Sequence, residues 1–355
     1  YRRLRQMCIR DRLNMWYESD LDSLMTRTCL RPIPTGKLTK SQALAFGILA
    51  SLVSVAALYI FSNLLAARNL TITILFYVFW ELMLVPTYFI IGIWGEGSRV
   101  YATMKFVIYT LVGSLLMLVA ILTLTMVHYG ATHEVTFDLR ILAHTHIDPF
   151  MQIWMFLFFF VAFAIKIPVF PLHSWLPHAY MACPIPALIL LTGAMSKTGA
   201  YGFLRFCLPL FPEAIESMAL VIGFMAASGM VYGAWIALAQ RDIKSLVAYS
   251  SISHLGFIVL GIFAQNGEGI EGSVLQMVNH GIIASALFII VGFIELRMGT
   301  RKLGELKGLS KSMPVLYGVF MLVMLAALGL PGLNGFVGEF LILMGVWTSS
   351  LLSNV

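Results

Sequence analysis

The sequence predicts an all-α polytopic membrane protein, a bundle of about nine transmembrane helices of which two are broken. Of 355 residues, 59% are hydrophobic and only 11% are charged, whereas soluble domains contain roughly 25% charged residues. The apolar residues fall into runs of about 20, the length that a helix needs to cross ~30 Å of hydrocarbon. Two runs are longer and contain proline and glycine, which interrupt helices. These observations exclude a soluble enzyme.

Short polar segments separate the predicted spans along the chain. The spans lie near residues 41–66, 71–93, 104–128, 150–182, 184–208, 216–238, 245–264, 272–296 and 313–351. The two long runs carry internal breakers, Lys166-Ile-Pro-Val-Phe-Pro-Leu-His-Ser-Trp-Leu-Pro in 150–182 and Leu330-Pro-Gly-Leu-Asn-Gly in 313–351. We therefore predict one broken helix in each of these two runs.

The order of the spans and the charges of the loops predict the topology. The broken helices are an odd number of spans apart, so they should cross the membrane in opposite directions, which indicates inverted repeats around a pathway at the midplane. If the spans alternate, the loops near 27–40, 95–105, 239–244 and 297–312 share one side and hold most of the lysines and arginines. This asymmetry places that side in the cytoplasm. It also explains the net charge of +6 without a nucleic-acid partner.

Six titratable residues lie within the apolar runs or next to their breaks: Glu81, Lys166, Lys197, His254, His280 and Glu339. A charge at the bilayer centre costs at least ~2.5–3.5 kcal/mol, so such residues usually have a function. Taken alone, a Glu–Lys pair can be a static ion pair, and a single buried histidine is more often a packing residue. Two glutamates, two lysines and two histidines on six different helices instead favour a path for protons.

Other kinds of chemistry have no signature in the sequence. A Gly-rich phosphate loop, a haem or iron–sulfur cysteine pattern and a nucleophile constellation are all lacking. The four cysteines (Cys8, Cys29, Cys183 and Cys207) show no paired spacing that suggests a disulfide or a zinc site. The loop 129–149 is rich in histidine, but its spacings fit no standard ligand pattern. We expect this loop to be solvated rather than to bind a metal.

From about residue 71 to its end, the chain contains six stretches typical of one family. They are Phe76-Tyr-Val-Phe-Trp-Glu-Leu-Met-Leu-Val-Pro, Lys166-Ile-Pro-Val-Phe-Pro-Leu-His-Ser-Trp-Leu-Pro-His-Ala, Lys197-Thr-Gly-Ala-Tyr-Gly-Phe-Leu-Arg-Phe, Asp242-Ile-Lys-Ser-Leu-Val-Ala-Tyr-Ser-Ser-Ile-Ser-His-Leu-Gly, His280-Gly-Ile-Ile-Ala-Ser-Ala-Leu-Phe and Pro331-Gly-Leu-Asn-Gly-Phe-Val-Gly-Glu-Phe. With them the chain resembles the subunit M (chain 4) family of the proton-translocating NADH–quinone oxidoreductase, respiratory complex I. Cation/proton antiporter subunits of the Mrp type are members of the same family.

The resemblance implies a role for each of the six titratable residues. Glu81 and Lys166 correspond to a coupling ion pair and Lys197 to a central lysine. His254 and His280 correspond to the connecting histidines, and Glu339 to a terminal acid. At His178 the family often has an acid, but this position lies outside the proton path. Asp242 is expected to order a loop on the cytoplasmic side.

The resemblance also implies a setting for the chain. Its partners would be the lipid bilayer and the other membrane subunits of the complex, in the bacterial plasma membrane, and it would conduct protons. The chain itself would bind no cofactor, since NADH, flavin, iron–sulfur clusters and quinone belong to other subunits.

The first 70 residues differ from this family. They include a part, 13–70, that contains the span at 41–66 and the stretches Asn14-Met-Trp-Tyr-Glu-Ser-Asp-Leu-Asp and Arg27-Thr-Cys-Leu-Arg-Pro-Ile-Pro-Thr-Gly-Lys. With these stretches, residues 13–68 resemble a fragment of protoheme IX farnesyltransferase, a membrane prenyltransferase. Asn14, Glu18 and Asp22 are spaced by four residues on one helical face, which suits Mg²⁺ bound to a diphosphate. That family needs a second acidic motif, which the remainder of the sequence lacks, so this motif is expected to be vestigial and prenyl transfer is the alternative that we do not favour.

Residues 1–12 resemble neither family and read as a translated adapter, a basic leader rich in arginine. We therefore expect a chimera of three parts, with boundaries at 12–13 and 70–71. In the third part, 71–355, the family's early helices are missing and the inverted repeats are incomplete.

Overall fold

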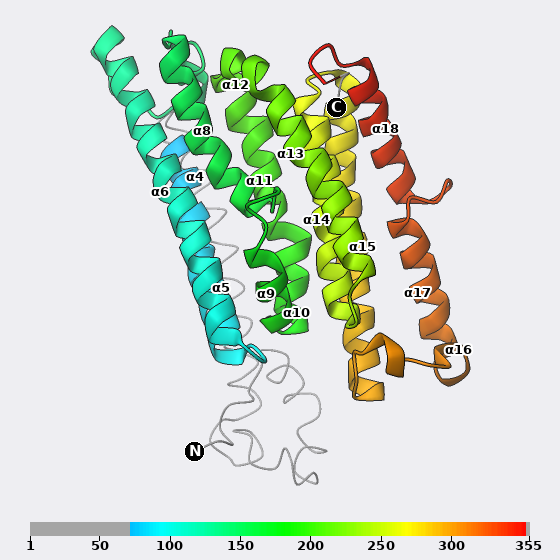
Figure 1. The fold of residues 1–355 in the computed structure, drawn as a ribbon. Helices are drawn as coiled ribbons and strands as arrows, with labels where there is room; N and C mark the ends of the chain where they lie inside the picture. Colours follow the sequence, from blue (N-terminus) through cyan, green and yellow to red (C-terminus); the bar gives the residue numbers. More distant parts are fainter. Residues whose placement is uncertain (1–71, 353–355) are drawn as a thin grey trace, which may run out of the picture. The chain divides into compact units, whose positions relative to one another are not determined.

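The computed structural model describes residues 72–352, which form a bundle of long helices (Figure 1). Regular structure in this range is helical, apart from one isolated β-bridge between Asp242 and Lys302. The predicted all-α membrane fold is therefore confirmed. The predictions for the leader 1–12, for the prenyltransferase-like fragment and for its motif Asn14, Glu18 and Asp22 lie outside the described residues.

The helices follow the predicted spans closely. In chain order they are α4 (Ile72–Leu82), α5 (Leu84–Trp94), α6 (Arg99–Thr132), α7 (Leu139–Leu142), α8 (Pro149–Lys166), α9 (Trp175–Ala182), α10 (Ile185–Leu190), the π-helix η1 (Leu191–Met195), α11 (Lys197–Gly202), the π-helix η2 (Phe203–Cys207), α12 (Leu208–Leu210), α13 (Pro212–Leu238), α14 (Ile243–Phe263), α15 (Gly267–Met298), the 3-10 helix η3 (Leu303–Glu305), α16 (Leu309–Ser312), α17 (Pro314–Ala327) and α18 (Asn334–Thr348). Within 72–352, six helical segments are long and apolar enough to span a membrane.

Both predicted helix breaks are present. The first separates α8 from α9 after Lys166, where Pro168 and Pro171 offer no N–H to continue the helix. The second separates α17 from α18, where Gly329 and Gly332 adopt positive φ. In Figure 1 the chain descends from α8 to α9 and ascends from α17 to α18, so the two broken helices have opposite directions as predicted.

Two interruptions were not predicted from the sequence. The span expected at 71–93 consists of α4 and α5, separated by a turn at Met83. Pro86 explains this turn, because its ring would clash with the carbonyl of Leu82 in a continuous helix. The span expected at 184–208 contains the π-helices η1 and η2 on either side of α11.

An aromatic core fixes α8 in the bundle. Phe163, one turn before Lys166, lies edge-on to Phe203 of η2, with ring centroids 5.5 Å apart. Phe163 also contacts Trp80 of α4, with centroids 5.4 Å apart in an edge-on arrangement. Such aromatic pairs contribute about 0.5–1.5 kcal/mol beyond the area that they bury. The C-terminal end of α8 is therefore held from two sides by rigid rings.

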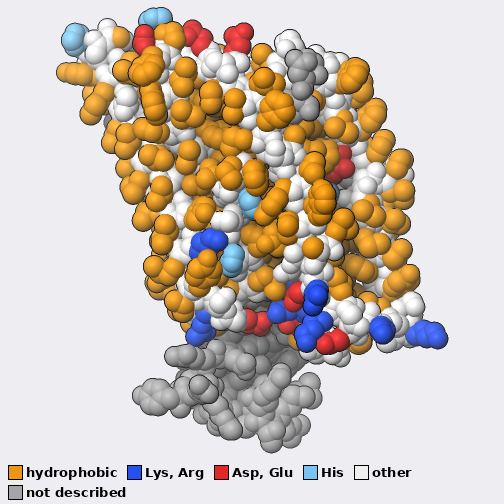
Figure 2. All heavy atoms as spheres, viewed as in Figure 1, with side chains coloured by type: hydrophobic (Ala, Val, Ile, Leu, Met, Phe, Trp, Pro, Cys, Tyr) orange, Lys and Arg blue, Asp and Glu red, His pale blue; other side chains and the backbone are white. Residues whose placement is uncertain are grey.

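The two ends of the bundle differ in charge. On the face shown in Figure 2, lysines and arginines gather at the lower end together with several acids, whereas the upper end carries acids and histidines. At the basic end, Arg301 pairs with Asp242 (3.3 Å), Glu295 (3.2 Å) and Glu96 (3.5 Å). Asp242 also accepts a hydrogen bond from the backbone N–H of Lys244 and so caps α14. Asp242 thus joins the start of α14 to Arg301, which lies in the loop between α15 and α17.

At the other end, Asp138 caps the short helix α7 through the backbone N–H of Arg140. The hydrogen bond from the Arg140 side chain lowers the pKa of Asp138. This acid therefore remains ionised at neutral pH although its side chain is buried.

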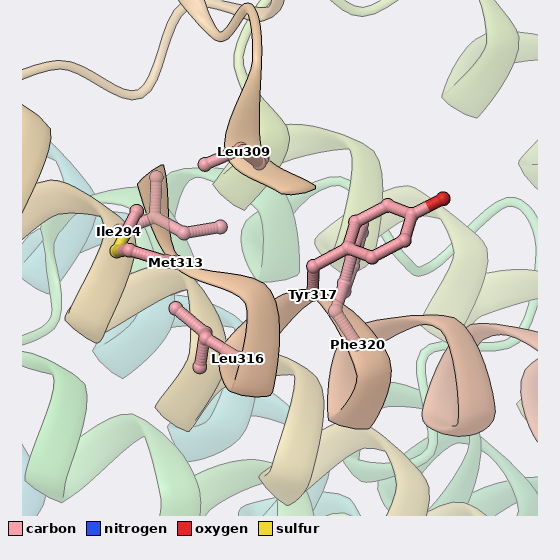
Figure 3. A pocket seen from close by; sticks show the side chains of 6 residues that line it. All are labelled: Ile294, Leu309, Met313, Leu316, Tyr317 and Phe320. Carbon is pink, nitrogen blue, oxygen red and sulfur yellow. The ribbon is translucent and has the colours of Figure 1, made fainter. Parts of the chain in front are cut away.

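A small apolar pocket lies where the short helix α16 closes against α15 and α17 (Figure 3). Its lining consists of Ile294, Leu309, Met313, Leu316, Tyr317 and Phe320. None of these side chains is charged, and none belongs to the six titratable residues predicted from the sequence. The pocket is a packing feature of the basic end.

Candidate proton-transfer site

Lys197 meets His280 in the interior of the bundle. The Nζ atom of Lys197, on α11, lies 2.7 Å from Nδ1 of His280, on α15, and His280 is 3% exposed. Nζ also donates to the backbone carbonyl of Thr192 and to the hydroxyl of Ser196. With a protonated lysine as donor, Nδ1 is the acceptor and the ring carries its proton on Nε2.

The π-helix η1 creates the acceptor for Lys197. In η1 the backbone N–H of Ser196 bonds to the carbonyl of Leu191, five residues earlier. The carbonyl of Thr192 accepts the Ser196 hydroxyl at 2.9 Å and the Lys197 ammonium. Single π-turns within α-helices are frequent at functional sites. Here the turn supplies a polar cradle for a lysine in an apolar span.

His254 and Glu339 form a second contact. Nδ1 of His254, on α14, lies 3.0 Å from Oε1 of Glu339, on α18. The same oxygen accepts a hydrogen bond of 3.1 Å from Nε2 of Gln276, on α15. The rings of His254 and His280 are 5.8 Å apart between centroids. We call Lys197, His280, His254 and Glu339 the proton row.

Lys166 lies at the first helix break, and Glu81 lies on α4. Lys166 is 2% exposed, and its Nζ has no hydrogen-bond partner among the described residues. Oε1 of Glu81 is also buried without one. Nζ lies over the ring of Trp80, 4.7 Å from the centroid.

The structure thus brings four of the six predicted residues into one row, whereas Lys166 lies at the first break and Glu81 lies on α4. Sequence reasoning missed Gln276, the carbonyl of Thr192 and the ring of Trp80. Of these, only Gln276 could have been found from the sequence. It lies four residues before His280 and hence on the same face of an apolar helix. His178 lies outside the row, where its Nδ1 is 3.0 Å from the carbonyl oxygen of Ser174.

The side chains of the proton row are of types that can accept and release protons. A neutral imidazole can accept a proton on one nitrogen while it releases another proton from the second. His280 has this freedom, because Nδ1 contacts Lys197 whereas Nε2 is buried without a partner. A carboxylate that accepts two N–H bonds can terminate such a path. Within 72–352, no group of three or more His, Cys, Asp or Glu side chains could hold a metal ion.

Comparison with known proteins identifies a family over most of the chain. The family described as NADH:quinone oxidoreductase/Mrp antiporter, TM, matches residues 67–355. NADH-quinone oxidoreductase subunit M of Pseudomonas aeruginosa is 46% identical over 279 residues, which are 77% of this chain and 55% of that protein. The Escherichia coli subunit M is 44% identical over 276 residues, 76% of this chain and 54% of that protein. The chain therefore spans about half the length of the curated relatives that it matches.

Solved structures agree with the sequence relatives. A chain of respiratory complex I from Thermus thermophilus with bound NADH matches with a TM-score of 0.73 and 39% identity, covering 78% of this chain and 58% of that chain. A chain of the Mrp complex from Dietzia matches with a TM-score of 0.69 and 26% identity, covering 78% of this chain and 52% of that chain.

Proposed function

Because this chain belongs to the NADH:quinone oxidoreductase/Mrp antiporter family of transmembrane proteins, we propose that it translocates protons across the membrane as an antiporter-like subunit of an NADH–quinone oxidoreductase. The setting that we propose is the bacterial plasma membrane, with the other membrane subunits of the complex as neighbours. NADH oxidation and quinone reduction would take place in other subunits and drive the movement of protons here.

One observation carries this proposal. Four titratable side chains from four separate helical elements meet in the interior, with 2.7 Å between Lys197 and His280 and 3.0 Å between His254 and Glu339. A static structural role would need each charge to be neutralised by a partner of opposite sign. Lys197 instead faces an imidazole, a carbonyl and a hydroxyl. That environment suits a lysine that gives up its proton.

The proposed path starts at the first helix break. A change in the distance between Glu81 and Lys166 alters the electrostatic stabilisation of the lysine and so loads or releases a proton there. Water carries the proton from Lys166 to Lys197, since no hydrogen bond of Lys166 leads onward. His280 accepts the proton on Nδ1 and releases the Nε2 proton towards His254. His254 then delivers a proton to Glu339 on the second broken helix.

A cation/proton antiporter subunit of the Mrp type is the second candidate. A sodium ion in such a path would require several oxygen ligands, because hard cations bind carboxylates, carbonyls and water. The proton row contains two imidazoles, one ammonium and only one carboxylate. This composition favours a proton over a metal cation as the conducted species, and we expect translocation to continue without sodium.

The test is Lys197→Ala in the assembled membrane complex, with proton pumping into vesicles measured per NADH oxidised. We expect pumping to be lost while assembly stays detectable. The matched control is Lys105→Ala, since Nζ of Lys105 lies over the Tyr101 ring, outside the row, and its loss should leave pumping unchanged. Undiminished pumping by the Lys197 variant would contradict the proposed function.

A further inference from the structure

Gln276 is the buried amide that contacts the proton row. It lies on α15, four residues before His280, so the two side chains share one face of the helix. Gln276 is 2% exposed, and its Nε2 donates to Oε1 of Glu339 at 3.1 Å. That oxygen is also the one that faces Nδ1 of His254. The carboxylate is therefore held by two nitrogens from two different helices.

The packing of α15 against α18 leaves Gln276 little freedom to turn away. At Gly338, the residue before Glu339, an added Cβ would lie 2.5 Å from Oε1 of Gln276 and 3.1 Å from its Cβ. Small residues permit such close crossings of membrane helices. The side chain of Gln276 thus extends along a crossing that only glycine allows, directly to the carboxylate one residue further on.

The chemistry of the amide determines which of its ends faces Glu339. The reversed amide would place its oxygen against a carboxylate oxygen, whereas the observed orientation places an N–H there. Oε1 of Gln276 is buried and has no hydrogen-bond partner within residues 72–352. An unsatisfied buried acceptor is costly, so the contact with Glu339 is made at the expense of the other end of the amide. This is unusual for a residue that serves packing alone.

We propose that Gln276 is a positioning residue of the proton row, which holds the Glu339 carboxylate in the orientation that receives the proton from His254. The inference rests on the proposed function of the row. In this role Gln276 exchanges no proton. Its N–H stabilises the ionised carboxylate and fixes Oε1 at the meeting point of α14, α15 and α18. Without it, Glu339 keeps only one of its two donors and can rotate away from His254.

The experiment compares two substitutions at this position in the assembled complex, by protons pumped per NADH oxidised. Gln276→Met keeps the length and flexibility of the side chain but removes the donor. Gln276→His is bulkier and keeps a ring N–H. A hydrogen bond to a charged group is worth about tenfold or more in an equilibrium. We therefore expect pumping to fall about tenfold in Gln276→Met and to stay within about twofold of the original in Gln276→His.

A packing role predicts the opposite order, because methionine adapts to irregular spaces and an imidazole does not fit a close helix crossing. Pumping by Gln276→Met at the original level, or greater impairment of Gln276→His, would overturn the inference. If the methionine variant does not assemble, Gln276→Leu replaces it in the experiment. Leucine also lacks a donor, so the same loss of pumping is expected. The matched control is Gln152→Met, since Gln152 is 5% exposed and bonds only to the backbone N–H of Ala214 at 2.9 Å.

Lys197→Ala in the same series separates the two hypotheses. If it pumps normally, the proposed function of the row is wrong. If it fails to pump whereas Gln276→Met pumps normally, the row stands and only the role of Gln276 is wrong.

Discussion

The two broken helices give their charged residues different environments: the lysine at the first break lacks hydrogen bonds to described residues, whereas the acid at the second break accepts two. At the first break, Lys166 ends α8 and is 2% exposed. Its ammonium has no hydrogen-bond partner in the described part of the chain and faces the ring of Trp80. At the second break, Glu339 lies on α18 with two N–H donors on one oxygen and a side chain that is 18% exposed. Helices that match in sequence pattern and run in opposite directions thus provide two different environments.

The difference indicates a division of labour. A buried charge without a partner is unfavourable, and a buried charge with hydrogen bonds is far less so. The first break therefore keeps Lys166 in a state that a small movement of Glu81 changes strongly. The second break holds its acid in one orientation. On this view, the first break responds to a driving signal and the second receives the proton.

The largest expected effect is that of Lys166→Met. In the proposed path Lys166 loads the proton, so removal of its ammonium should lower pumping at least tenfold. The substitution also removes a buried ammonium that has no hydrogen-bond partner among the described residues, and replacement of buried charges by apolar side chains is often stabilising. We therefore expect the midpoint of thermal unfolding to rise. Proton pumping and thermal unfolding of the purified complex measure both effects.

Lys244→Met is the matched control for this variant. Lys244 is equally buried, at 1% exposure, but it donates to the carbonyls of Met181 (3.0 Å) and Cys183 (2.8 Å) at the end of α9. Its replacement should lower the unfolding midpoint and leave proton transfer in place. If the two variants destabilise the protein to the same extent, Lys166 is not strained and the contrast between the breaks is wrong.

An intermediate effect is expected for Gly329→Ala at the second break. Gly329 has φ +67°, and an added Cβ would lie 2.8 Å from Oε2 of Glu339. The alanine would strain the backbone by about 1–2 kcal/mol and would push the carboxylate away from His254. We expect pumping per NADH to fall severalfold, together with a lower unfolding midpoint.

Gly332→Ala separates these two causes. Gly332 has φ +95°, and a Cβ there would meet nothing within 4 Å. This variant should share the loss of stability and retain pumping. Equal pumping by the two alanine variants would mean that the orientation of Glu339 is not critical.

Local signals explain how much of this fold could be predicted from the sequence. Span positions depend on the lengths of apolar runs, and the first break depends on Pro168 and Pro171, whose effect on a helix is local. The titratable residues of the row stood out because charges and histidines are costly in apolar spans. The pattern thus located the breaks and named the members of the row.

The missed features depend on packing in three dimensions. Apolar spacing does not distinguish a π-turn from an α-turn, so the sequence revealed neither η1 nor the hydrogen bond from Lys197 to the Thr192 carbonyl. The partner of Glu339 is set by the rotation of α15 and α18 about their axes, and the sequence does not reveal this rotation. For the same reason the sequence suggested a pair between Glu81 and Lys166 but not the position of Trp80 beneath the ammonium.

The smallest expected effect is that of Trp175→Phe, which tests how the first break is held. The backbone N–H of Val169 bonds to the carbonyl of Ala164 (2.9 Å), and the carbonyl of Ile165 accepts the indole N–H of Trp175 at 2.8 Å. The hydrogen bond from Trp175 fixes the backbone beside Lys166, but the indole N–H does not bond to the lysine ammonium.

Phenylalanine keeps an aromatic side chain at this position but is smaller than the indole and removes the donor, at a cost of about 1–3 kcal/mol for the carbonyl left unsatisfied. We expect a lower unfolding midpoint and pumping within about twofold of the original. Trp235→Phe is the control, because that indole is 73% exposed on α13 and its change should alter neither quantity. A loss of pumping as large as that of Lys166→Met would show that hydrogen bonds fix the first break as firmly as the second. The two breaks would then differ only in the charges of their side chains, and not in how firmly hydrogen bonds hold the backbone.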